Sequence, residues 1–196
     1  MYHCGRWDRL SYFLPYPRRA AAAIRRHYDD GARGCMFYQG PVINPGVEMN
    51  IAVGGRILAD PHRAVDDALA EVIASSYRPR NSAAHKALVE LFLRAEDAYF
   101  GRWDPARFAA AGRSVPGELH LTDLFGIAPG PALYLLEPFL DADGRREYKK
   151  RLIAVLQDLA GLEGRCDDGG RLERIQKAVT VTLTTLDTIR AAKKHS

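Results

Sequence analysis

The chain has 196 residues, of which 47 % are hydrophobic and 27 % are charged, and its formal net charge is +4. These values are ordinary for a folded protein of one or two domains and exclude a chain that is disordered throughout. No apolar run approaches the roughly 20 residues of a membrane-spanning helix, and the N-terminus lacks the basic-then-apolar layout of a signal peptide. We therefore expect a cytoplasmic protein that makes no membrane contact.

Metal, cofactor and nucleic-acid sites are not expected. The three cysteines, Cys4, Cys35 and Cys166, are odd in number and too widely spaced for a disulfide framework or a metal site. The histidines form no ligand motif, and no phosphate-binding glycine loop or nucleophile motif occurs. Part of the positive charge lies at the C-terminus, where it suits the last turn of a helix better than a nucleic-acid surface.

The N-terminal region predicts a strand, a helix and a second strand. Residues 9–14 are rich in aromatic and aliphatic side chains, which favours a strand. Pro17 suits the first position of a helix that runs to about Tyr28, supported by the alanines at 20–23. Residues 35–38 then form the best candidate for a buried strand. This order is typical of a parallel crossover unit.

Two parallel strands do not form a stable sheet alone, because both faces must be covered and both edges need neighbours. The β-branched, alternating residues 179–185 could supply another strand. However, apolar residues recur at helical steps across that stretch, at Leu172, Ile175, Val179, Leu183, Leu186 and Ile189, so we predict a helix there. The front strands are then expected to pair with missing upstream sequence or with another subunit.

Helices are predicted for most of the remaining chain. They run from Glu48 to Leu58, from Asp60-Pro61 to about Tyr77, from Asn81 or Ser82 to Gly101, and over residues 144–162 and 170–192. Between them, residues 104–130 are irregular, with a short helix from Asp104 to Ala111. The expected fold is predominantly α with a short N-terminal βαβ piece. Its expected divisions are a partial α/β barrel end at 1–46, a helical segment at 47–103 and a C-terminal helical subdomain at 104–196.

The end of the second predicted strand is the first candidate binding site, because ligands of parallel α/β folds lie beyond the carboxyl ends of strands. Tyr38 offers a ring and a hydroxyl there, and Gln39 offers donors and an acceptor. A sugar needs both stacking and directional hydrogen bonds. The alternative is that Tyr38 belongs to the core and Gln39 to a turn.

Three further residues are candidates for substrate contact. Trp7 could stack on a sugar, and Arg6 could bind a carboxylate with its planar fork, although packing of the N-terminal segment would also explain both. Glu48 is the one acid close behind the strand end. Glycoside hydrolysis usually requires two carboxylates, so Glu48 alone fits the first turn of a helix better than a catalyst.

The chain resembles a family of uncharacterised bacterial proteins related to α-glucuronidases over residues 1–103. The segments that carry the resemblance are Gly5-Arg6-Trp7, residues 28–40, residues 48–53, Asp60-Pro61 with residues 65–69, and Ser76-Tyr77. Where the family ends a helix with Tyr-Tyr-Gly, this chain has Ser76-Tyr77-Arg78.

The resemblance implies the end of a (β/α)₈-type barrel followed by a helical domain. It implies a carbohydrate ligand at Tyr38 and Gln39, but the acid pair of such barrels would come from earlier strands that this chain does not contain. We therefore expect a sugar-contacting, C-terminal part of a glycoside hydrolase-like protein that is not catalytic alone. The alternative is a helical protein–protein interaction module that docks its N-terminal strands on a partner chain or on a second copy.

Overall fold

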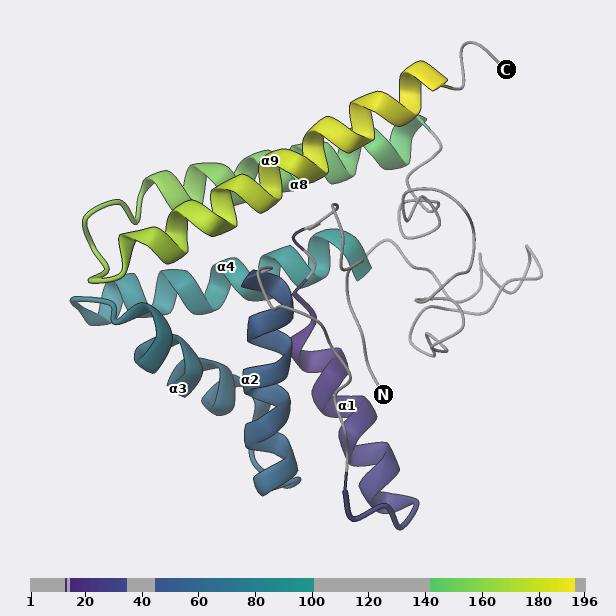
Figure 1. Cartoon of the computed structure of the whole chain (residues 1–196), viewed down its shortest axis with the longest axis vertical. Helices are drawn as coiled ribbons and strands as arrows, with labels where there is room; N and C mark the ends of the chain where they lie inside the picture. Colours follow the sequence, from purple (N-terminus) through teal and green to yellow (C-terminus); the bar gives the residue numbers. More distant parts are fainter. Residues whose placement is uncertain (1–12, 14, 35–44, 101–141, 193–196) are drawn as a thin grey trace.

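The structure is a computed structural model that describes residue 13 and residues 15–34, 45–100 and 142–192 (Figure 1). These residues form six helices, namely α1 (Pro17–Asp29), α2 (Pro45–Ala59), α3 (Val65–Tyr77), α4 (Ser82–Phe100), α8 (Ala142–Ala160) and α9 (Gly169–Ala192). The predominantly helical character that the sequence predicts is confirmed.

The predicted βαβ piece and the barrel end are not shown, because the described residues contain no strand. The stretches in which strands were expected, 9–14 and 35–38, lie outside the described residues except for Phe13. Phe13 belongs to no strand and is fully buried. Its ring lies 5.7 Å from that of Phe92 in α4, so the chain enters the helical core immediately before α1.

Helix α1 begins at Pro17, as predicted, because the fixed φ of proline suits a first helical position. Its N-cap residue, Tyr16, supplies no side-chain hydrogen bond to the first turn. The helix ends at Asp29, and Gly31 follows with a φ of +99°, a conformation that glycine adopts without a steric penalty. Its buried face consists mostly of alanines, which allows α2 to approach closely.

Helices α2 and α3 continue the same layer. Helix α2 contains Gly54 and Gly55, each of which disfavours a helix by roughly 1 kcal/mol. Burial of Met49, Val53 and Ile57 on one face offsets that preference, because most helical stability in proteins comes from packing. Helix α3 ends at Tyr77, and the C-cap residue Arg78 takes the left-handed conformation with a φ of 46°.

Helices α8 and α9 form an antiparallel hairpin that lies along α4, while α1, α2 and α3 extend from the opposite side of α4 (Figure 1). The short connection between α8 and α9 favours this antiparallel arrangement. The rings of Tyr99 in α4 and Tyr148 in α8 meet edge to face at 6.1 Å.

Backbone hydrogen bonds join the α3–α4 turn to the α8–α9 turn. The N–H of Arg80 donates to the carbonyl of Arg165 at 2.9 Å, and the N–H of Asp167 donates to the carbonyl of Arg78 at 3.1 Å. Pro79 and Cys166 form an isolated antiparallel bridge between them. We call residues 78–80 and 165–167 the turn clamp. It holds one end of the hairpin against the end of α3.

The predicted apolar stripes form one continuous core. In α4 the residues of the apolar stripe are all buried, namely Ala84, Leu88, Leu91, Phe92, Ala95 and Tyr99. Leu172, Ile175, Val179 and Leu186 of α9 are buried as well, so the helix predicted across the β-branched stretch is confirmed. The expected boundary at 103/104 lies outside the described residues, and that at 46/47 falls within α2.

Candidate functional site

Most of the residues predicted to contact a sugar lie outside the described part of the chain. They are Arg6, Trp7, Tyr38 and Gln39. Their roles therefore stay predictions. Glu48 is the one predicted site residue that the structure describes.

Glu48 lies in the first turn of α2, as predicted, and binds two arginines of α9. Its Oε1 is 2.7 Å from Nη2 of Arg174, and its Oε2 is 3.3 Å from Nη1 of Arg171. Arg171 also pairs with Asp168, whose Oδ1 accepts the backbone N–H of Arg171 in the first turn of α9. The carboxylate of Glu48 thus joins the beginnings of two helices.

The cluster around Glu48 contains two carboxylates, of Glu48 and Asp168, and two guanidinium groups, of Arg171 and Arg174, so their charges balance. The buried Tyr77 lies near it, and burial raises the pKa of its phenol, assisted by the charge of Glu48 and opposed by Arg171 and Arg174. The phenol therefore stays neutral at physiological pH. Both carboxylates here, Glu48 and Asp168, are engaged by Arg171, which suits a structural ion-pair network better than an acid–base pair.

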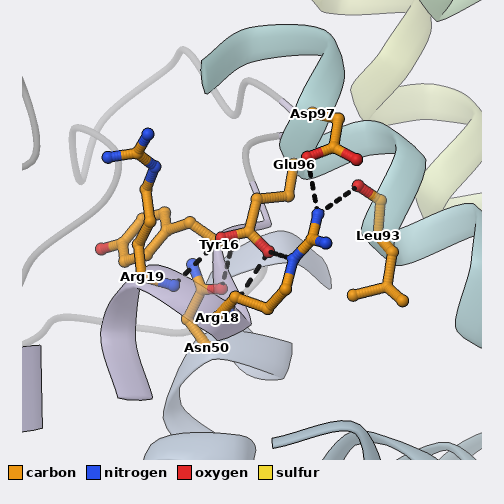
Figure 2. A network of polar contacts seen from close by, with 7 residues as sticks. All are labelled: Tyr16, Arg18, Arg19, Asn50, Leu93, Glu96 and Asp97. Atoms are coloured by element: carbon orange, nitrogen blue, oxygen red, sulfur yellow. Dashed lines mark hydrogen bonds and ion pairs between the residues drawn. The ribbon is translucent and has the colours of Figure 1, made fainter. Parts of the chain in front are cut away.

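A second polar cluster surrounds the buried carboxylate of Glu96 in α4 (Figure 2). Its Oε2 accepts the backbone N–H of Arg18 at 3.2 Å, and its Oε1 accepts the backbone N–H of Arg19 at 3.0 Å. These are first-turn donors of α1, which the helix cannot satisfy itself. Glu96 therefore caps α1 from another helix, in place of the missing side-chain cap at Tyr16.

Arg18 extends this cluster along α4. Its Nε is 3.2 Å from Glu96 Oε2, and its Nη2 lies 2.6 Å from Oδ1 of Asp97 and 3.3 Å from the carbonyl of Leu93 (Figure 2). On the other side, the N–H of Tyr16 donates to Oδ1 of Asn50 at 2.6 Å. The start of α1 is thereby fixed to both α4 and α2.

Burial shifts the pKa of the Glu96 carboxyl above its usual range, because desolvation outweighs the opposing hydrogen bonds from Arg19 and Arg18. For Arg18, burial alone would lower the pKa, but hydrogen bonds to Asp97 and Glu96 raise it. The sequence contains one signal for this cluster that was missed. Glu96 is a charged residue on the apolar stripe of α4, between Ala95 and Tyr99.

The third feature is an open groove on the outer side of the hairpin, which we call the α8 basic face. Among the described residues, nine line it: Arg145, Arg146, Lys149, Lys150, Ile153, Ala154, Gln157, Leu186 and Asp187. Four of these side chains are cationic and one is a carboxylate. Ile153 is 46 % exposed, which is unusual for a large apolar side chain among the described residues. From the sequence, this region was predicted only to be a helix, and no binding surface was predicted on it.

The acids near the α8 basic face leave it with excess positive charge. Lys149 pairs with Asp187 of α9, and Arg146 pairs with Asp143 at 2.6 Å, one turn earlier in α8. Lys150 is exposed and forms no ion pair with a described residue. The face therefore combines an apolar centre with a cationic rim.

Neither a metal site nor a membrane-spanning helix is found among the described residues. No group of three or more His, Cys, Asp and Glu side chains among them is arranged to hold a metal ion. None of the described helices combines the length and the apolarity needed to cross a membrane. Cys166 is a buried free thiol in the turn clamp, and burial raises its pKa.

No family model, curated protein or solved structure matches the chain. These comparisons add no support to the resemblance to α-glucuronidase-related proteins, and a carbohydrate ligand stays a prediction.

Proposed function

We propose that the chain is a helical protein–protein interaction module that docks a partner on the α8 basic face. The observation that carries the proposal is Ile153, a large apolar side chain that is 46 % exposed inside a groove lined by four cations. Isolated exposed hydrophobics need no explanation, but an apolar centre with a charged rim is the arrangement of a protein interface.

The contrast with other charged clusters supports this choice. The Glu48 and Glu96 clusters join different helices, and Glu71 likewise joins α3 to Arg56 of α2 at 2.6 Å. Those charges are used to hold the fold together. On α8, Lys149 likewise pairs with Asp187 of α9. Arg146 and Lys150, by contrast, are exposed on the side of α8 that faces away from the buried Tyr148 and Leu152.

Docking through the N-terminal strands stays a prediction, as does sugar contact through Tyr38 and Gln39, because those residues lie outside the described part of the chain. Neither prediction conflicts with a docking surface on α8. The proposed module needs no catalytic group.

The proposal is tested by site-specific photo-cross-linking in cells that naturally express the chain. A benzophenone amino acid replaces Ile153, and in a matched control it replaces Val181, which is 37 % exposed on α9 but does not line the groove. We expect a protein adduct of defined mass from position 153, lost when Arg146→Glu and Lys150→Glu are added. Equal adducts from both positions, or none from position 153, would contradict the proposal.

A further inference from the structure

We infer that the partner segment bound by the α8 basic face is an acidic amphipathic helix of another protein. This inference rests on the proposed function and names the chemistry of the partner. The arrangement of charge and apolar surface along α8 carries it.

The exposed stripe of α8 has helical spacing and a suitable length. Arg146, Lys150, Ile153 and Gln157 follow one another at steps of four, three and four residues, so they lie in one row along the helix. The row spans about 16 Å, or three turns. A partner helix lying along it would place two carboxylates one turn apart opposite Arg146 and Lys150, and an apolar side chain two turns along, beside Ile153.

The cross-section of the groove is also amphipathic. Ile153 and the small Ala154 supply apolar surface, and Arg145 and Lys149 flank it. A small residue at 154 allows a partner backbone to approach. A purely acidic, extended chain would satisfy the rim but leave the apolar surface uncovered, whereas an amphipathic helix covers both.

A protein helix fits this surface better than a nucleic acid. Asp187 of α9 lines the groove. On α8, Asp143 pairs with Arg146, and Glu147 pairs with Arg151. A continuous row of phosphates would face these carboxylates as well as the cations. A separate helix can instead place its own acids only opposite the cations, which is how charge patterns give specificity.

The chain itself contains one competing occupant. Residues 118–141 include Glu118, Asp123, Glu137 and Asp141 and no lysine or arginine. If these residues cover the face, a peptide added in trans should bind more tightly once the four acids are changed to amides. The experiment below therefore includes that variant.

The inference is tested by fluorescence anisotropy with the full chain and a labelled 14-residue peptide of glutamate and leucine in amphipathic helical order. The controls are a peptide of the same composition in scrambled order, a duplex DNA and vesicles of anionic lipid. We expect the amphipathic peptide to bind most tightly, and Arg146→Glu with Lys150→Glu to weaken it by about tenfold or more. Val181→Glu is the matched substitution outside the groove and should change nothing.

Several results would overturn the inference. Equal binding of the scrambled peptide would mean that only net charge is read, and tighter binding of DNA or vesicles would assign the face to those ligands. A clear gain in affinity after neutralising the four acids of residues 118–141 would mean that the chain covers its own face. If no peptide binds while the cross-link at position 153 persists, the interaction module stands and the acidic helix is wrong.

Discussion

The backbone N–H of Phe13 donates a hydrogen bond to the hydroxyl of Thr182, 3.1 Å away and 169 positions along the chain. Thr182 is fully buried in α9, and its hydroxyl in turn donates to the carbonyl of Ala178 at 2.9 Å. The β-branched stretch of α9 is therefore helical and takes part in this tertiary contact through Thr182. It presents one polar group to the segment that leads into α1.

Replacing Thr182 with valine should lower the free energy of unfolding by about 1–3 kcal/mol, because the buried N–H of Phe13 would lose its acceptor while the side-chain shape is nearly kept. Thr180→Val is the matched control, since Thr180 is exposed and bonds only within α9, to the carbonyl of Gln176. Urea denaturation of both variants measures the difference. Equal effects would show that the Phe13 contact contributes nothing.

Glu96→Gln should destabilise the protein at neutral pH by about 1–3 kcal/mol, because the amide nitrogen cannot accept a backbone N–H, whereas both oxygens of the carboxyl group can. Asp97→Asn is the comparison. The carboxylate of Asp97 is exposed and accepts a bond from the Arg18 side chain, whereas the two backbone N–H groups of α1 donate to Glu96. We expect that variant to change stability by about 0.5 kcal/mol or less. Loss of α1 helicity in Glu96→Gln would be measured by circular dichroism.

The pH dependence of stability follows from the raised pKa of Glu96. Because the folded state holds the proton more tightly than the unfolded state, the contribution of Glu96 is greatest below the ordinary carboxyl pKa. This contribution to stability declines as the pH rises from the ordinary carboxyl pKa to the raised pKa of the folded state. The stability difference between the native chain and Glu96→Gln should therefore shrink as the pH rises through this window. A difference that grows instead would contradict the raised pKa.

Most of the helices were predictable from a local signal, but α3 begins at Val65 and not at Asp60-Pro61, where the sequence predicted its start. Pro17 marks the start of α1, and Asn81 caps α4, accepting the N–H of Ala84 at 2.8 Å. The helical spacing of apolar residues also correctly predicted a helix, and not a strand, around Thr182. The capping role of Glu96 was not predictable, because it depends on α1 and α4 meeting, 78 positions apart. The α8 basic face was missed for a related reason, since its groove forms only where α9 lies beside α8.

Arg78→Gly should raise the free energy of unfolding by about 1 kcal/mol. Arg78 takes a left-handed conformation at the end of α3, which is strained for any residue with a Cβ atom. Arg78→Ala is the control, because it removes the same side chain but keeps the strain. Thermal unfolding should show a gain for the glycine variant alone.

The ion pair between Glu48 and Arg174 should contribute about 1 kcal/mol of coupling to stability, because both side chains are only partly exposed, by 26 % and 36 %. A double-mutant cycle with Glu48→Gln and Arg174→Gln measures it. The pair Lys86–Glu90, which lies on the surface of α4 at 4.0 Å, provides the comparison cycle and should give less. Additive effects at Glu48 and Arg174 would mean that the α2–α9 contact does not depend on this pair.

The turn clamp contains a buried thiol, Cys166, whose chemical labelling can report when the two turns separate. Cys166 sits at its centre, 5 % exposed and bridged to Pro79, with its thiol pKa raised by burial. A thiol reagent reaches the buried sulfur when the bonds between the two turns break, and burial keeps the thiol protonated and unreactive while those bonds are intact. The rate at which Cys166 is labelled therefore measures how often the α8–α9 hairpin separates from the end of α3.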